Sequence, residues 1–183
     1  MKSAVCAIYI FLCFFNSAQA QKVSFVEKRT SYHTYVKGVN FEGVIFSEDF
    51  AFPFLSQQSK ERRFTPTTAE IETAESLLAA NLKSVNQLKI NQGGENGPVI
   101  HENLSKFVRQ YYGYISQSGE KIVFISCLLK ANYTSSGKEL PNWLKGAVVV
   151  LNGGSNYWQV QANLKSNSLF GLSVNSLAKA GSR

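Results

Sequence analysis

The sequence predicts an α+β fold in which one main helix packs on an antiparallel meander sheet. Three observations predict it: an apolar stripe at helical spacing within residues 65–85, a glycine-rich loop at 91–98, and strand-like apolar runs from residue 104 onward. A helix followed by strands with short connections packs across one face of the sheet that those strands form.

The first twenty residues have the pattern of a secretory signal peptide. Met1-Lys2 supplies a positive start, residues 4–15 are apolar and uncharged, and residues 18–20 place alanine at the two positions that a signal peptidase recognises. The apolar run at 4–15 is too short for a membrane-spanning helix, which needs about 20 apolar residues. We therefore expect an exported protein, periplasmic or extracellular, with a mature chain from Gln21 and no membrane span after signal cleavage.

Residues 21–63 form a phenylalanine-rich N-terminal segment with weak patterning. Within it, residues 39–46 are the one stretch that we expect to be a strand, and Pro53 and a polar run end the segment. Its phenylalanines are Phe25, Phe41, Phe46, Phe50, Phe52 and Phe54.

The main α+β domain is expected over residues 64–178, and it opens with the helix. Thr65 is a suitable N-cap with Pro66 in the first helical position, while Thr67 and Glu70 offer an alternative start as a capping box. The apolar stripe consists of Ile71, Ala74, Leu78, Leu82 and Val85.

Strands are expected at 104–115, 122–129, 147–151 and 157–164, followed by a last strand at 170–174. The stretch 104–115 also suits a helix, but its tyrosines favour extended chain. The dipeptide Asn152-Gly153 suggests a hairpin turn. Residues 179–183 are expected to be a frayed tail. Trp158, Val160, Ala162 and Leu164 alternate on one face of the strand 157–164, which the helix is expected to cover. Phe170, Leu172 and Val174 alternate in the last strand.

Several short motifs together resemble a family of small uncharacterised exported proteins of Bacteroidota. They are Phe-Thr-Pro-Thr at 64–67, Arg-Gln-Tyr at 109–111 with Gly113, Gly-Glu-Lys at 119–121, Gly-Gly at 153–154, Tyr-Trp at 157–158 with Val160, and Leu-Ser-Val-Asn at 172–175. The resemblance covers roughly residues 64–178. It implies an exported source and this order of elements, and it carries no activity.

The order of elements is also similar to that of cystatin-like folds. This likeness is topological, so it carries little functional weight. The segment 159–163 departs from the inhibitory Gln-x-Val-x-Gly hairpin of cystatins and is predicted to be strand. The sequence therefore does not support protease inhibition by that route.

The composition disfavours most site chemistries. The histidines, the single aspartate and Cys127 have no ligand-like spacing, so we expect no metal and no cofactor. Cys127 lies in an apolar run and is expected to be a small buried residue. The net charge of +7 is spread too thinly for nucleic acid, which leaves only attraction to acidic polymers or anionic lipid headgroups.

The leading hypothesis is a non-enzymatic binding or interaction module for a protein, small-molecule or glycan ligand. Its contact surface is expected on the sheet face opposite the helix, where side chains of the strand 157–164 point away from Trp158. The candidate binding residues are Tyr157, Gln159, Gln161, Trp143 and Tyr111. One alternative is a small enzyme with a pocket between helix and sheet and His33 or His101 as the acid–base group. Another is a structural component of the cell envelope.

Overall fold

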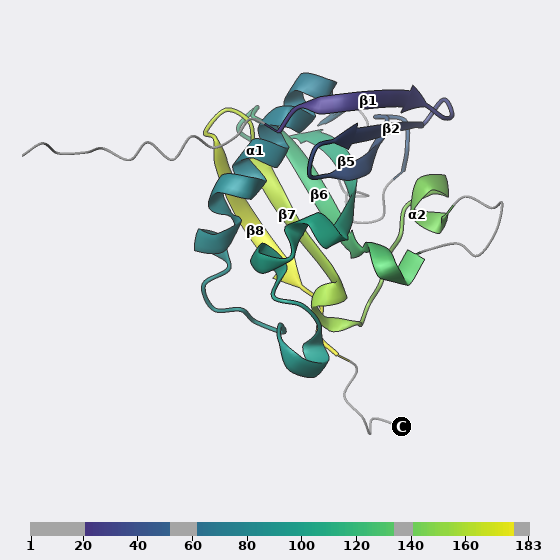
Figure 1. The fold of residues 1–183 in the computed structure, drawn as a ribbon. Coiled ribbons are helices and arrows are strands. Elements are labelled where there is room, and N and C mark those ends of the chain that lie inside the picture. The colour runs from purple at the N-terminus through teal and green to yellow at the C-terminus, as the bar shows by residue number, and fades with distance from the viewer. Residues whose placement is uncertain (1–20, 52–61, 134–140, 178–183) are drawn as a thin grey trace, which may run out of the picture.

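The structure is a computed structural model that describes residues 21–51, 62–133 and 141–177. One long helix, α1 (Thr68–Val85), lies against one face of an eight-stranded, mostly antiparallel sheet (Figure 1). The predicted α+β class is therefore confirmed. The expected signal peptide at 1–20 and the tail at 179–183 lie outside the described residues.

The sheet follows the chain except at one crossover. Its strand order is β1-β2-β3-β5-β6-β7-β8, with β4 paired to β5. All neighbouring pairs are antiparallel except β3 and β5, because α1 connects these two strands and returns the chain in the same direction. The strands are β1 (Val23–Lys28), β2 (His33–Gly38), β3 (Glu42–Phe46), β4 (Arg63–Phe64), β5 (Phe107–Ile115), β6 (Lys121–Leu129), β7 (Tyr157–Asn163) and β8 (Ser168–Val174).

Helix α1 begins at the second of the two predicted starts. Thr67 is the N-cap, and it forms a capping box with Glu70: each side chain accepts a hydrogen bond from the other residue's backbone N–H. Thr65 instead accepts a hydrogen bond from the backbone N–H of Glu48. The predicted stripe is buried from Ile71 to Leu82, whereas Val85 at the helix end is exposed.

The N-terminal segment holds three strands where one was expected. Strand β3 lies within the predicted stretch 39–46, but β1 and β2 precede it as a hairpin. Strand β1 is exposed along most of its length, so its sequence has no buried face to give an alternating pattern. The edge backbone of β1 is held by α1, because Val23 donates its N–H to the Glu72 carboxylate.

Strand β8 departs from the predicted alternation at Gly171. This glycine adopts a left-handed conformation with φ +62°, and the register with β7 shifts at the same place. The bulge changes which side chains point inward. Leu172 and Val174 pack towards the helix, but Phe170 lies on the opposite side and is 41% exposed.

The sheet face opposite the helix is covered, which corrects the expectation of an open face. Residues 147–151, predicted as a strand, form none and instead follow a short helix, α2 (Asn142–Lys145), across this face. The resulting second core consists of Val44, Phe46, Val108, Tyr112, Tyr114, Ile122, Phe124, Leu128, Trp143 and Leu144. The central strands are therefore buried on both sides.

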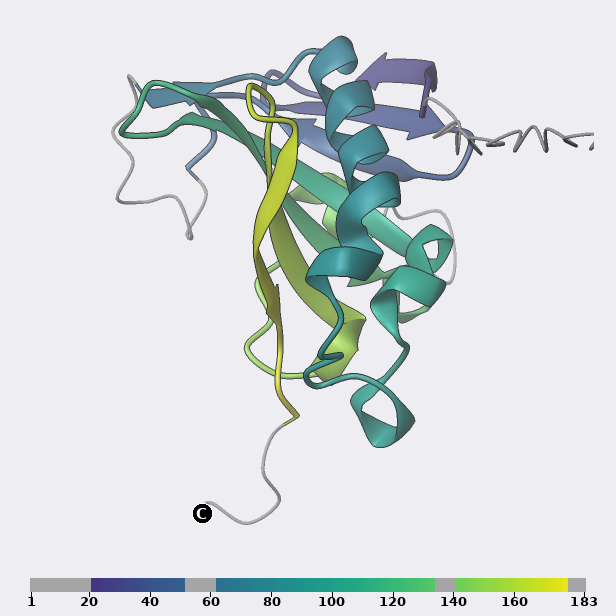
Figure 2. The same cartoon turned by 90° about the vertical axis from the view of Figure 1, so that its left-hand side faces the viewer.

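Three connections converge at the C-terminal end of β8. The Asn91 side chain donates to the backbone oxygen of Val174 at 3.1 Å, and Asn175 donates to that of Val150. The backbone N–H of Gly153 donates to the backbone oxygen of Ser176 at 3.1 Å. Figures 1 and 2 show the chain after α1, the turn before β7 and the end of β8 together at the lower end of the molecule.

Candidate functional site

Two of the five predicted binding residues are buried, so they contribute no contact surface. Tyr111 lies under α1 with no exposed area, on the opposite side of the sheet from the predicted face. Trp143 is 3% exposed and packs in the second core. The sequence placed Tyr111 wrongly because β5 is buried on both faces, and such a strand shows no alternation.

The other three predicted residues are half-buried and partly engaged. Gln161 accepts a hydrogen bond from the Tyr114 hydroxyl. Tyr157 packs edge-on against Tyr133, with ring centroids 6.2 Å apart. Gln159 lines a hollow of about 140 Å³ beside Leu151. These three residues share one face of β7, as predicted, but they do not form a broad open surface.

His33, one of the two predicted acid–base candidates, lies among aromatic rings. Its ring centroid is 4.7 Å from that of Phe46 and 5.3 Å from that of Phe50. Burial lowers the pKa of His33, because the apolar surroundings disfavour the imidazolium. The side chain therefore favours a neutral packing role.

A buried charged cluster connects the middle of α1 to the sheet. The Arg109 Nε lies 3.3 Å from Glu75 Oε1, and the Tyr111 hydroxyl donates to the same oxygen at 2.9 Å. The Arg109 guanidinium also donates to the backbone oxygen of Phe107. Glu75 is 2% exposed and the other two side chains are fully buried. Burial disfavours the Arg109 charge, but the Glu75 carboxylate outweighs it and the pKa of Arg109 is raised.

Cys127 lies beside this cluster and is fully buried, as the sequence predicted for it. Burial raises the pKa of its thiol well above the ordinary value, although the Arg109 charge acts in the opposite direction. The thiolate needed for nucleophilic chemistry is therefore disfavoured. The cluster of Glu75, Arg109 and Tyr111 is a fixed internal cross-link of the core.

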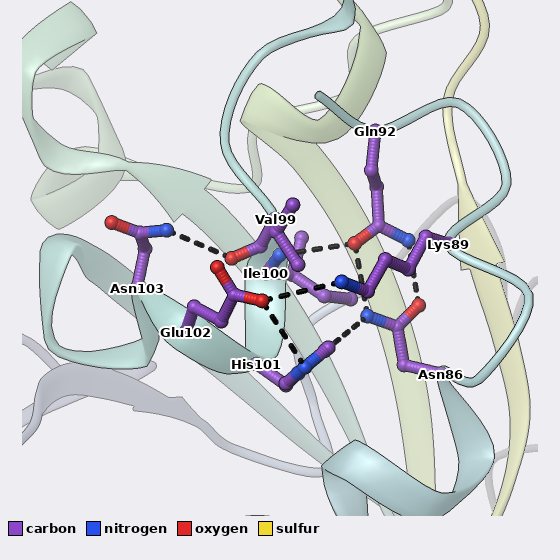
Figure 3. A network of polar contacts seen from close by, with 8 residues as sticks. All are labelled: Asn86, Lys89, Gln92, Val99, Ile100, His101, Glu102 and Asn103. Atoms are coloured by element: carbon purple, nitrogen blue, oxygen red, sulfur yellow. Dashed lines mark hydrogen bonds and ion pairs between the residues drawn. The ribbon is translucent and has the colours of Figure 1, made fainter. Parts of the chain in front are cut away.

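A second polar cluster stands at the C-terminal end of α1 (Figure 3). Asn86, which caps the helix, forms a reciprocal amide pair with Gln92: Asn86 Nδ2 donates to Gln92 Oε1 at 2.9 Å, and Gln92 Nε2 donates to Asn86 Oδ1 at 2.6 Å. Gln92 also accepts from the Ile100 N–H at 3.0 Å and donates to the Ile90 oxygen at 3.3 Å. The pair joins the two ends of the loop between α1 and the following 3₁₀ turn, and we call this pair of Asn86 and Gln92 the clasp.

The same backbone contacts fix the tautomer of His101. The Ile100 N–H requires an acceptor at Gln92 Oε1, so neither amide can be turned over without bringing two donors together. Asn86 Nδ2, 2.9 Å from His101 Nδ1, is therefore a donor, and Nδ1 is the acceptor. The ring proton sits on Nε2, which lies 3.7 Å from Glu102 Oε1.

The clasp holds a loop that presents aliphatic side chains to solvent. Lys89 and Asn91 both have positive φ values, 45° and 55°, a conformation that costs energy for residues other than glycine. Leu88, just before Lys89, is 83% exposed, and Ile90, between Lys89 and Asn91, is 60% exposed. Such a loop is costly in an isolated protein, because its backbone is strained and its apolar side chains face water.

Further exposed aliphatic residues lie at the same end of the molecule. Leu151 is 82% exposed. Its neighbour Val150 accepts a hydrogen bond from the Asn175 side chain just after β8, which places Leu151 at this end. We call the whole set the aliphatic end; its members are Val85, Leu88, Ile90, Val149, Leu151 and Leu177. They account for more than half of the exposed large apolar side chains in the described parts of the chain.

Two open hollows border the loop. One of about 500 Å³ lies between residues 84–92 and residues 172–174 of β8. The other, about 910 Å³, lies on the other side of the loop and is lined by Lys83, Lys89, His101 and Glu102 among others. Lys89 Nζ is 3.3 Å from Glu102 Oε1, so these two charges partly neutralise one another.

Comparison with protein-family models, with curated proteins and with solved structures finds no match. No helix among the described residues is long and apolar enough to cross a bilayer. Within the same residues, no three His, Cys, Asp or Glu side chains are grouped to hold a metal ion. The resemblance to exported Bacteroidota proteins stays a prediction.

Sequence reasoning missed the aliphatic end and the clasp beneath it. Asparagine and glutamine amides give no catalytic or metal-binding pattern, so nothing in the sequence pairs Asn86 with Gln92. One signal was available: Leu88 and Ile90 follow the helix within a polar loop, where no apolar stripe accounts for them.

Proposed function

We propose that the protein is a non-enzymatic exported binding module and that the aliphatic end is its contact surface. One observation carries the proposal: a strained loop, fixed from beneath by the clasp of Asn86 and Gln92, holds Leu88 and Ile90 out in water. Binding a partner would remove these side chains from water and return the free energy that the exposed loop costs.

The state of the histidines favours binding over acid–base catalysis. His101 lines the larger hollow, but its Nδ1 lone pair accepts from Asn86 and its Nε2 carries the proton. A general base needs a free lone pair aimed at the substrate. His33 is enclosed by phenylalanine rings. These contacts favour packing and hydrogen-bonding roles for the two imidazoles over proton transfer.

Site-specific photo-crosslinking in the exporting cells tests the proposal. A photoreactive amino acid replaces Leu88 or Leu151 in turn. The matched control replaces Val39, which is 78% exposed in the turn after β2, near the opposite edge of the sheet from β8. After illumination, intact mass measurement is expected to show an added mass, from a protein or a lipid, at both leucine positions and none at Val39. Equal adducts at all three positions, or none at the leucines, would overturn the proposal.

A further inference from the structure

We infer that the partner of the aliphatic end is a lipid bilayer surface, which the loop tips enter to the depth of the headgroups. This inference rests on the proposed function, since it names the partner of the same surface. It is carried by the shape of the tips, by their charge, and by the hydrogen bonding of the backbone beside them.

The apolar side chains project as separate tips from three connections. Leu88 and Ile90 come from the loop after α1, Leu151 from the turn before β7, and Leu177 from the chain after β8. Leu88 and Leu151 are each more than four-fifths exposed. A folded protein would need a separate pocket for each tip, whereas fluid acyl chains close around all of them without prior fit.

The charge of these connections suits an anionic surface. The segments 85–93, 147–156 and 172–177 contain no aspartate or glutamate, and their one charged residue is Lys89. Lys89 stands between Leu88 and Ile90, and its exposed side chain pairs with Glu102 at 3.3 Å. At an anionic surface its long side chain can exchange this carboxylate for a lipid phosphate while its neighbours insert. The full chain carries a net charge of +7, to which the expected signal peptide contributes only Lys2, so the exported protein stays positive and is attracted to anionic lipids.

Four backbone carbonyls beside the tips are hydrogen-bonded internally, which lowers the cost of moving them out of water. The carbonyl of Ile90 accepts from Gln92, and that of Val174 accepts from Asn91. The carbonyls of Val150 and Ser176 accept from Asn175 and Gly153. Side-chain amides supply three of these four bonds, so the polar residues between the aliphatic ones serve to satisfy the backbone.

Vesicle flotation of the exported protein tests the inference. The probes are phosphatidylcholine vesicles and vesicles of phosphatidylcholine and phosphatidylglycerol at three to one. The protein is expected to float with the anionic vesicles and more weakly with the neutral ones. The double variant Leu88→Ser and Leu151→Ser is expected to bind at least about tenfold more weakly. Lys89→Gln is expected to lose about fivefold on anionic vesicles alone.

Val39→Ser is the matched control, because it removes a similarly exposed aliphatic side chain that follows β2, near the opposite edge of the sheet from β8. It should bind like the wild type, and all variants should keep the wild-type thermal unfolding curve. Absence of wild-type flotation at millimolar lipid, or equal flotation of the double variant, would overturn the inference. If flotation fails while Leu88 still gives a protein adduct in cells, the binding function stands and the bilayer is the wrong partner. If flotation and crosslinking both fail, the bilayer inference and the proposed binding function are both wrong.

Discussion

Helix α1 holds two polar clusters that differ in almost every respect. The cluster at its middle is charged and sealed, with Glu75, Arg109 and Tyr111 all buried. The cluster at its C-terminal end is built from the neutral amides of Asn86 and Gln92 and lies beneath an exposed loop. The first joins helix to sheet, and the second fixes the shape of one loop.

Under the proposed function, stability and binding depend on different ends of one helix. A buried ion pair is strongly destabilising when one partner is lost, but it leaves no surface that a ligand can reach. A pair of neutral amides stabilises less than an ion pair, yet this pair holds a strained loop in one conformation. We therefore expect changes in the middle to affect folding and changes at the end to affect binding.

The largest effect is expected from Glu75→Ala. It leaves Arg109 charged and unpaired in the core, so the free energy of unfolding should fall by about 3–5 kcal/mol, measured by denaturant titration. The control is the double variant Glu75→Leu and Arg109→Met, which removes both charges and should recover most of the loss. A loss of under about 1 kcal/mol in Glu75→Ala would contradict a sealed cluster.

The next largest effect is expected from Gln92→Ala, which opens the clasp. Asn86 and the Ile100 N–H lose their partner, which should cost about 1–3 kcal/mol. Hydrogen exchange at Ile100 should accelerate, and the nitrogen chemical shifts of His101 should no longer show the proton confined to Nε2. Gln87→Ala, an exposed change in the same loop, is the control. Unchanged exchange at Ile100 would mean that the clasp does not hold the loop.

At the other end of the helix, Thr67→Ala should lower the free energy of unfolding by about 1 kcal/mol, because the capping box is lost. Thr65→Ala is the matched comparison, since Thr65 is the other residue suited to start the helix. Denaturant titration of both variants decides between the two starts. A larger loss at Thr65 would place the cap there.

A smaller effect, confined to acid, is expected from His33. Its pKa is lowered in the folded protein, so below pH 6.5 the unfolded chain binds a proton that the folded protein does not. Stability should therefore fall as the pH drops through this range and return as it rises. Thermal unfolding of His33→Phe between pH 7.5 and 5 should show a weaker pH dependence than the wild type. Identical slopes would assign the acid sensitivity elsewhere.

The sequence predicted those elements whose burial follows a regular period. The stripe from Ile71 to Leu82 gave α1, and the alternation around Trp158 gave β7 with the correct inward face. The sequence did not predict contacts that depend on long-range packing. An example is the hydrogen bond between Tyr111 and Glu75, which lie 36 positions apart. Residues 147–151, which cover the sheet face opposite the helix, form irregular chain, and the sequence could not predict this cover because irregular chain has no periodic pattern.

The candidate site was harder to predict for the same reason. Its residues are amides and aliphatics of common type, and their meaning depends on which side of the loop each one faces. Only the misplaced apolar character of Leu88 and Ile90 was visible in advance. Trp143 and Tyr111 attracted attention as large aromatics, but size favours burial as much as binding.

Both outer strands of the sheet are interrupted, and each has a backbone group that is hydrogen-bonded to a side chain. In β1 the register shifts near Val23, and Glu72 accepts that residue's N–H; in β8 the bulge at Gly171 bends the strand, and Asn91 occupies the carbonyl of Val174. An unbroken edge is a template on which further chains add and polymerise. Interrupted edges of this kind are poor templates for a further strand, so we expect the protein to stay unpolymerised at high local concentration.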